Sequence, residues 1–426
     1  MEATASSDAE IQKIIDFQKE VIPVIDSALS KQFPKRIALS DTETTLGVDS
    51  ELLKNQAEYY FDNSDTQNLK VVFLVSKEEK KEIKAVRKEL EEKLGVKVKF
   101  KIAKKDPETL HELPEAIAKY LDSQSYKGSY AIGYDVPNED INIRADLTDN
   151  QISALKEKFG ADSLDIKKEK VENIPLYARD YPFSSLGGGQ AIYIKGAGCT
   201  SGYIATKNNQ AYMVTAGHCV NSGASSAIIE GNFSDGWATL GYEHWSGYNA
   251  TSKYDLGLIR LTNTSFNVTS RFYTKNNGSG AIDGQLRPFI TVGDSGIKAG
   301  LVINKSGANT GITSATVSEA DSIVKYSDSS FYHKVIYANV LSGYLINGTT
   351  QVFAGSGDSG ATVYRASDYA LVGVVSGATQ DYVSGGTYYG KVGHITPAWY
   401  ATTLLGSTFY QYNKTYDTSI SNLQGQ

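Results

Sequence analysis

Residues 355–360 read Gly-Ser-Gly-Asp-Ser-Gly, a short loop in which a serine stands between an aspartate and a glycine. Glycines allow the backbone to turn sharply and to approach a ligand closely. They also leave amide groups that can point toward an oxyanion. Ser359 therefore suits a nucleophile, although an ordinary surface turn has the same composition. The choice between the two depends on whether a base and an acid stand elsewhere in the chain.

His218 is the best candidate for the base. It follows the apolar residues 212–214 and the small residues 215–217, and it directly precedes Cys219. Small neighbours permit tight packing, which would hold the imidazole in the single orientation that a general base needs. His111 lies on a charged helix, and we expect no role for it. His244, His333 and His394 have Tyr-rich or Gly-rich surroundings, for which we expect surface or structural roles.

Asp255 is the best candidate for the acid that would orient this base. It stands in the apolar stretch 254–259, Tyr-Asp-Leu-Gly-Leu-Ile. A carboxylate in an apolar strand is costly unless it is paired. The alternative is an aspartate that starts the strand and caps its own turn. The presence of His218 and Ser359 favours the paired carboxylate, which would fix the imidazole tautomer.

The chain changes character near residue 185. Of the first 185 residues 63 are charged, against 27 of the remaining 241, and 34 of the 39 glycines lie in the second part. The first part is typical of a helix-rich α+β region. In the second part, short alternating strands separated by Gly, Asn, Ser and Asp turns predict an all-β domain, a set of barrels or a sandwich. One helix is expected over 397–405, with Pro397 in its first turn.

Periodicity predicts the elements of the first part, in which no catalytic cluster is visible. We expect helices over 9–30, 77–94, 109–122 and 149–159, and strands over 71–75, 96–102, 130–134, 141–145 and 163–172. The part ends in residues 177–189, where a proline, paired serines and three glycines predict an exposed, cleavable boundary.

Composition argues against several classes of protein. The net charge is −6 and no basic block is present, so we expect no nucleic-acid partner. No apolar run approaches transmembrane length, so we expect a soluble protein with no membrane partner. The first residues, Met-Glu-Ala-Thr-Ala, contain neither a basic nor an apolar signal region, so we expect a signal peptide to be absent or already removed.

Cys199 and Cys219 are the two cysteines of the chain. Two free buried thiols are one interpretation. The surrounding Tyr, Ser, Thr, Asn and Gly residues favour an extracellular setting and a disulfide. Such a bond would close a loop of about 20 residues, worth roughly 3 kcal/mol in the chain-entropy model.

Three strings in this order resemble the active-site motifs of the chymotrypsin-like serine proteases: TAGHC at 215–219, YDLGLIRL at 254–261 and GDSG at 357–360. The resemblance is to the bacterial streptogrisin and alpha-lytic protease group in particular, and it covers about residues 186–405. Supporting strings resemble that group's mature N-terminus, the start of its second barrel, and its substrate-binding strand with the closing helix, at 188–203, 305–317 and 376–399.

The resemblance implies roles for the three candidates. Ser359 would be the nucleophile, His218 the general base and then the acid, and Asp255 would orient His218. The N–H groups of Gly357 and Ser359 would form the oxyanion hole. The family hydrolyses peptide bonds through an acyl-enzyme, and we expect neither a cofactor nor a metal. A catalytically silent relative that binds through the same barrels is the competing class of function, and an esterase is a weaker alternative.

The resemblance also implies a domain division. A protease domain over 186–426 would hold two β-barrels, at about 186–290 and 295–395, then a C-terminal helix and a tail. Residues 1–185 would be a pro-region that assists folding, binds the protease intramolecularly and inhibits it until it is cut away. The whole would be secreted and monomeric.

The position of that cut has two interpretations. The family match places it at Ser185–Leu186, which offers a serine to the specificity pocket. The pocket has no acid at its base and no histidine where glutamate-selective members have one, so a large apolar or aromatic side chain is expected before the cut bond. That preference would favour cleavage after Phe183 or Tyr181.

Further positions follow from the resemblance. Ala361 stands where the family usually has a glycine, and we expect its methyl group to be accommodated. Lys305 stands where the group commonly has an arginine, so we predict a buried Lys305–Asp358 ion pair. The backbone of 376–378 would pair with an extended peptide. The predicted substrate-binding residues are Ser356, Val375, Ser376, Gly377, Ala378, Gly386 and Tyr388, within 354–356, 375–378 and 386–388.

Overall fold

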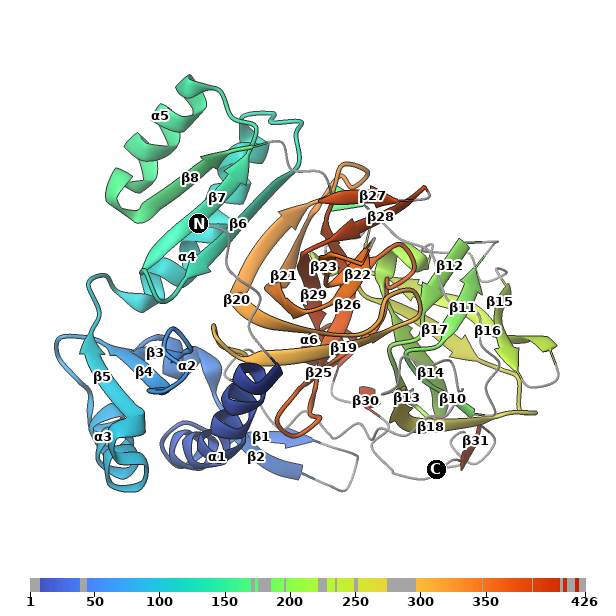
Figure 1. Ribbon diagram of the computed structural model, residues 1–426, viewed down its shortest axis with the longest axis horizontal. Helices are drawn as coiled ribbons and strands as arrows, with labels where there is room; N and C mark the ends of the chain where they lie inside the picture. The colour runs from blue at the N-terminus through green and yellow to red at the C-terminus, as the bar shows by residue number, and fades with distance from the viewer. Residues whose placement is uncertain are drawn as a thin grey trace.

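The computed structural model describes residues 8–38, 44–169, 173–174, 185–194, 197–220, 228–233, 236–248, 252–273, 296–346, 348–384, 386–406, 409–411 and 418–420. They form an N-terminal region, 8–174, that covers one side of a larger β region, 185–420 (Figure 1). The expected fold class, an α+β region before an all-β region of barrels with a helix near its end, is confirmed. None of the helices in these ranges is long and apolar enough to cross a membrane.

The first half of the N-terminal region packs two helices on one face of a three-stranded sheet. Its strands have the order β3-β4-β5, and β4 and β5 are parallel because helix α3 crosses between them. The apolar residues of α1 and α3 recur at helical spacing and share one core with β4. The elements are α1 (Asp8–Gln32), β1 (Pro34–Ala38), β2 (Thr44–Val48), α2 (Ser50–Lys54), β3 (Ala57–Asp62), β4 (Lys70–Val75), α3 (Lys81–Leu94) and β5 (Val98–Ile102).

The second half of the region adds three strands, β6, β7 and β8, which pair with one another. Helix α4 joins the halves, since it shares a core with the second face of β4 and with the new strands. The side chain of Asp106 caps α4, and Thr148 with Gln151 forms a capping box on α5. The elements are α4 (Pro107–Ser123), β6 (Tyr130–Asp135), β7 (Asp140–Ala145), α5 (Asp149–Phe159), β8 (Leu164–Lys168) and β9 (Asn173–Ile174).

The β region contains one closed barrel. Six strands follow each other in the order β19-β25-β26-β29-β21-β20, and β20 pairs back with β19. A closed ring leaves no free edge within the barrel. The strands are β19 (Val302–Gly307), β20 (Gly311–Lys325), β21 (Tyr332–Ser342), β25 (Thr362–Arg365), β26 (Leu371–Thr379) and β29 (Val392–Pro397). Small hairpins beside it use β22 (Tyr344–Ile346), β23 (Thr350–Val352), β24 (Ala354–Gly355), β27 (Tyr382–Ser384) and β28 (Thr387–Gly390).

The other barrel is open, and all of its strands except β30 precede the closed barrel in the chain. Its strands have the order β12-β11-β15-β16-β17-β14-β13-β30. They are β11 (Ala191–Ile194), β12 (Ala197–Thr200), β13 (Tyr203–Lys207), β14 (Gln210–Thr215), β15 (Ile228–Phe233), β16 (Gly236–Ser246), β17 (Gly257–Leu261) and β30 (Phe409–Gln411). A small sheet of β10 (Ser185–Gly188), β18 (Asn267–Phe272) and β31 (Thr418–Ser419) closes one end. Helix α6 spans Trp399–Leu405, so Pro397 ends β29 and does not lie in the first turn of the helix as predicted.

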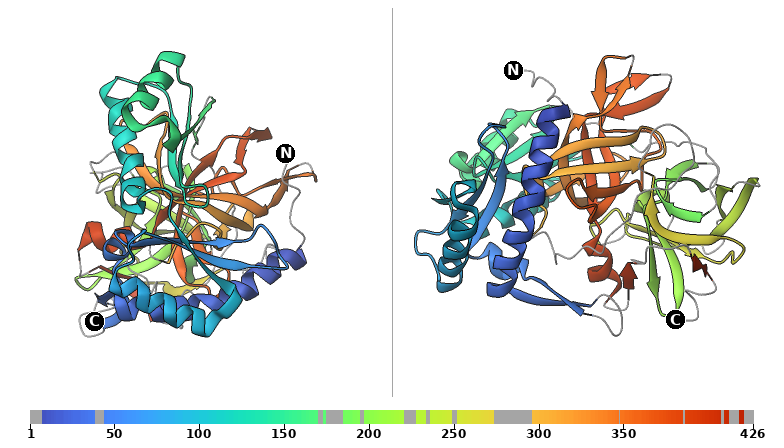
Figure 2. Two further views of the ribbon diagram at one scale, coloured as in Figure 1. Left: turned by 90° about the vertical axis from the view of Figure 1, so that its left-hand side faces the viewer. Right: turned by 60° about the horizontal axis from the view of Figure 1, so that its bottom comes forward.

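The N-terminal region joins the closed barrel through backbone hydrogen bonds. Strand β6 pairs antiparallel with β20, which extends the barrel sheet into β6, β7 and β8. Figure 2 shows α1 running alongside the closed barrel. There the Gln18 amide of α1 bonds the carbonyl of Gly300 and the N–H of Val302 at 2.7 and 2.9 Å. The two regions therefore share a sheet and a core.

Candidate active site

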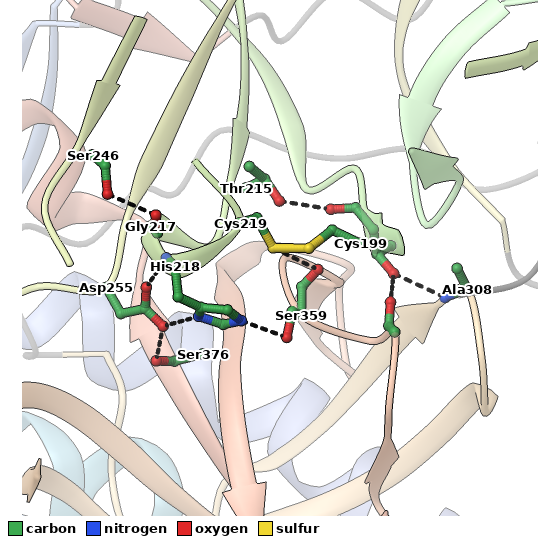
Figure 3. Close-up of a disulfide and its surroundings, with 12 residues drawn as sticks. Cys199, Thr215, Gly217, His218, Cys219, Ser246, Asp255, Ala308, Ser359 and Ser376 are labelled. Carbon is green, nitrogen blue, oxygen red and sulfur yellow. Dashed lines mark hydrogen bonds and ion pairs between the residues drawn. A yellow bond between two sulfur atoms is a disulfide. The ribbon is translucent and has the colours of Figure 1, made fainter. Parts of the chain in front are cut away.

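The three side chains predicted to work together lie together, between the two barrels (Figure 3). His218 follows β14 and Asp255 precedes β17 in the open barrel, whereas Ser359 lies between β24 and β25, the second of which is a strand of the closed barrel. His218 Nε2 lies 2.7 Å from Ser359 Oγ, and His218 Nδ1 lies 2.8 Å from Asp255 Oδ2. The imidazole thus bridges the hydroxyl and the carboxylate.

A tight turn, Gly217–Cys219, holds the imidazole in place. A Cβ atom at Gly217 would lie 2.9 Å from Asp255 Oδ1, so only glycine permits this approach. The backbone N–H of His218 donates to the same oxygen at 2.8 Å. The expected disulfide, Cys199–Cys219, is present and ties the turn to β12.

Asp255 is completely buried, and its surroundings favour its charge. Burial alone would raise its pKa, but the charge and hydrogen bond of His218, with His333 nearby and a hydrogen bond from Ser376, hold the pKa below its usual value. Burial lowers the pKa of His218, and the adjacent carboxylate of Asp255 more than offsets this and raises it. The pair can therefore take up a proton from a neighbouring hydroxyl.

The loop that carries Ser359 rests on a buried ion pair. Lys305 Nζ lies 3.2 Å from Asp358 Oδ2, and neither side chain is exposed. The Asp358 carboxylate also accepts the N–H groups of Asn309, Thr310 and Gly355 at 2.9, 3.1 and 2.9 Å. A charge without solvent needs this many partners. The loop that carries Ser359 is consequently fixed by several bonds to Asp358.

The glycines of this loop have the backbone freedom that was expected of them. Gly357 has φ = +110°, a conformation that favours glycine. Among the residues that the structure describes, the N–H groups of Gly357 and Ser359 have no hydrogen-bond partner. The carbonyl of Ser359 accepts the N–H of Thr200 at 2.7 Å.

Ala361 is fully buried in the core of the closed barrel, so its methyl group is accommodated.

Four predicted substrate-binding residues, Val375, Ser376, Gly377 and Ala378, lie in sequence on β26. Part of this strand is already paired with the N-terminal region, because β9 runs antiparallel to it with Ile174 opposite Ala378. Strand β9 thus lies at the position predicted for an extended peptide.

The other predicted pocket residues lie on the adjacent hairpins. Ser356 exchanges two hydrogen bonds with Tyr388, at 3.0 and 3.1 Å, so these residues lie side by side. Gly386 lies beyond Tyr388 at the exposed turn of the β27–β28 hairpin, where a Cβ atom would meet nothing within 4 Å. The structure does not bring Gly386 together with the β26 residues.

The predicted processing pair is buried. Ser185 and Leu186 start strand β10, and Leu186 belongs to the core of the open barrel. Cleavage between them would require this strand to leave its place. The alternative positions, Phe183 and Tyr181, lie outside the described residues.

Several polar residues near the site escaped prediction. Ser376 was selected for its backbone, yet its Oγ donates to Asp255 Oδ2 at 2.6 Å. Tyr326 lies 2.9 Å from Ser376 Oγ, and His394 lies 3.3 Å from the Tyr326 hydroxyl. No short motif marks these residues, because they come together only when the barrel closes.

His111, for which no role was expected, is largely buried between the two regions. His111 Nε2 is 2.6 Å from Glu58 Oε2, and His111 Nδ1 faces Asp321 Oδ2 at 3.6 Å. Lys298 pairs with Glu58 at 2.7 Å, and Lys54 lies 3.7 Å from Asp321. Burial lowers the pKa of His111, but the two carboxylates outweigh burial and raise it.

Comparisons with known proteins fit this geometry. No family model matches the chain. Serine protease 1 of Streptomyces fradiae is 31% identical over 194 residues, which are 46% of this chain and 45% of that protein. Streptogrisin-D of Streptomyces griseus is 27% identical over 241 residues, 56% of this chain and 50% of its own length. Among solved structures, Thermobifida fusca Protease A aligns with 54% of this chain and 100% of its own, at 21% identity and a TM-score of 0.40.

The resemblance to the streptogrisins is thereby confirmed. Streptogrisin-A of Streptomyces griseus is a further relative, 28% identical over 220 residues. The chain spans about half the length of the curated relatives that it matches.

Proposed function

We propose that the protein is a secreted serine endopeptidase, made as a precursor whose N-terminal region, 1–185, assists folding and inhibits the protease. The observation that carries this proposal is the arrangement of one imidazole, 2.7 Å from Ser359 Oγ and 2.8 Å from Asp255 Oδ2. The relatives that are serine proteases support it.

The mechanism follows from these contacts. Ser359 Oγ attacks the carbonyl carbon of the peptide bond while His218 Nε2 takes its proton, and Asp255 stabilises the imidazolium. The N–H groups of Gly357 and Ser359 receive the oxyanion, each donor being worth roughly 3–4 kcal/mol. His218 then protonates the leaving amine. Water hydrolyses the acyl-enzyme by the same steps, with His218 again as the base.

Two contacts support the inhibitory role of the N-terminal region. Strand β9 pairs with Ala378 and Thr379 at the end of β26, and β26 is the strand along which we expect a peptide substrate to bind. The pairing of β6 with β20 would hold the region on the protease before cleavage. We propose that substrates carry a large apolar or aromatic residue before the cut bond, and that the mature protein is a monomer.

Hydrolysis tests this proposal against a catalytically silent binding protein. After residues 1–185 have been removed, the protease should digest unfolded protein substrates, and Ser359→Ala should abolish digestion without changing the fold. Profiling the cut sites on a peptide library then measures the preference. Equal digestion by both chains would contradict the proposed role of Ser359.

The folding role has a separate test. Residues 186–426 expressed alone should give little active protein, and adding residues 1–185 as a second chain should restore it. Equal yields with and without the added region would rule out a role in folding.

A further inference from the structure

A chain of hydrogen bonds continues from Asp255 into the closed barrel. Ser376 Oγ donates to Asp255 Oδ2 at 2.6 Å, and the Tyr326 hydroxyl lies 2.9 Å from Ser376 Oγ. His394 Nδ1 lies 3.3 Å from the same hydroxyl. Ser376, Tyr326 and His394 are 2%, 4% and 0% exposed, so water does not replace any of these bonds.

The chemistry of the groups sets the direction of each bond. An ionised carboxylate only accepts, so Ser376 gives its single proton to Asp255. Ser376 Oγ must then accept from Tyr326, whose single proton is thereby used. The Tyr326 oxygen can accept only if His394 carries its proton on Nδ1. All three donors consequently point toward the carboxylate.

The surroundings of His394 agree with this direction. Burial, with a smaller contribution from the charge of Arg144, lowers the pKa of His394 to about 3, so the ring is neutral at ordinary pH. A neutral ring with its proton on Nδ1 has a bare Nε2. Within the described part of the chain, Nε2 has no hydrogen-bond partner. An unpaired acceptor is less costly in a buried site than an unpaired charge.

We propose that Tyr326 and His394 are positioning residues of the hydrolytic site, which act through Ser376 to hold and polarise the carboxylate of Asp255. The inference rests on the proposed function. Hydrogen bonds in a buried series strengthen one another. Ser376 donates to Asp255 Oδ2, the same oxygen that lies 2.8 Å from His218 Nδ1, so the donors take up part of the negative charge of that oxygen and less of it acts on His218. This row of hydrogen bonds, from His394 through Tyr326 and Ser376 to Asp255, thus fixes the plane of the Asp255 carboxylate. It also moderates the basicity of the His218 imidazole.

Other groups around Asp255 do not belong to this row. His333 bonds Ser329 at 3.0 Å and its ring stacks on Tyr248, whose hydroxyl bonds Asp328. These residues act on Asp255 only through space. They remain unchanged in the test, so their contribution to the pH profile is constant.

Two tyrosines offer a matched test. Tyr337 is buried, at 1% exposure, with its ring 4.7 Å from His394, and its hydroxyl has no partner among the described residues. Tyr326→Phe and Tyr337→Phe each remove one buried hydroxyl, but only the first breaks the row. Both are made in the full chain, and kcat and KM are measured after removal of residues 1–185, per reactive serine, over a range of pH.

Tyr326→Phe should lower kcat about fivefold, the equivalent in rate of one lost hydrogen bond, with KM within about twofold of wild type. The acid limb of the kcat/KM profile should move to higher pH, because Asp255 then acts more strongly on His218. Tyr337→Phe should change neither quantity. His394→Asn, whose amide nitrogen can replace Nδ1, should retain more of kcat than His394→Leu.

The outcomes separate this inference from the proposed function. Wild-type kcat and pH profile in Tyr326→Phe would overturn the row and leave the hydrolase intact. If Tyr326→Phe fails to fold, the two variants His394→Asn and His394→Leu provide the test. Equal kcat in these two variants would overturn the positioning role of His394 and Tyr326. No Ser359-dependent hydrolysis by the wild-type chain after removal of residues 1–185 would overturn both proposals.

Discussion

His218 and His111 are both buried imidazoles beside carboxylates, but their second nitrogens face different groups. His218 has Asp255 on one side and the hydroxyl of Ser359 on the other. His111 has a carboxylate on each side, Glu58 and Asp321. A general base needs a ring nitrogen that faces a hydroxyl and can take its proton. Of these two histidines, only His218 has such a nitrogen, Nε2. An imidazole between two carboxylates is satisfied best as a cation, which makes His111 a structural link.

The link of His111 crosses the boundary between the two regions. Glu58 and His111 belong to the N-terminal region, whereas Lys298 and Asp321 precede or belong to the closed barrel. We therefore expect changes at His218 to affect turnover and changes at His111 to affect the association of the regions.

The largest difference in kcat should appear when one carboxylate beside each histidine is replaced by an amide. Asp255→Asn should lower kcat by about ten-thousand-fold, because the amide no longer holds the correct tautomer of His218. Asp321→Asn should leave kcat of the processed protease unchanged. Both are measured by peptide hydrolysis per mole of folded protease. A similar loss in the two variants would remove the distinction between the sites.

Two buried lysines extend the same comparison to stability. Lys305→Met leaves Asp358 buried without its cation, and the free energy of unfolding of the protease should fall by about 3–5 kcal/mol with loss of turnover. Lys298→Met should weaken the contact with Glu58 and spare the turnover of processed protease. Denaturant unfolding and hydrolysis rates check both. Intact folding yield and turnover in Lys305→Met would contradict the role of the pair.

A smaller effect is expected at His111 itself. The test uses the full chain with Ser359→Ala, which should keep both regions together. In this background, His111→Gln should lower the free energy of unfolding at pH 6 by about 1–3 kcal/mol, because a buried charged hydrogen bond is lost. His244→Gln serves as the control, since His244 is exposed. Equal unfolding curves for the two variants would mean that the cluster adds no stability.

The smallest effect is the pH dependence of that difference. The folded-state pKa of His111 is raised, so its contribution is complete below the unfolded value of about 6.5 and is lost as pH rises through the folded value. The pKa values of Glu58 and Asp321 are lowered, so both carboxylates stay charged throughout this range. The difference between wild type and His111→Gln should shrink from pH 6 to pH 9, and a difference that grows with pH would reverse the assignment.

Sequence alone could predict the fold class and the group around His218, for a physical reason. Each of His218, Asp255 and Ser359 stands in a contiguous string whose neighbours build the turn or strand that holds it. The disulfide was predicted from the composition around the two cysteines, and the Lys305–Asp358 pair from the resemblance to the family.

The residues that escaped prediction depend on long-range folding. Glu58, His111, Lys298 and Asp321 are far apart in the chain, and each looks like an ordinary charge in its own segment. Ser376 was noticed for its backbone alone, since nothing near it in sequence indicates a bond to Asp255. The burial of Ser185 likewise comes from a parallel pairing with β18, which the loop-like composition of 177–189 conceals.

Labelling with a fluorophosphonate tests the central role of Ser359 most directly. The full chain is expressed, processed and treated with the reagent, and the modified residue is located by peptide mass spectrometry. We predict one label, on Ser359 Oγ, that is absent in Ser359→Ala and forms much more slowly in Asp255→Asn. No label after removal of residues 1–185, or a label on a different serine, would contradict the proposal that His218 and Asp255 activate Ser359.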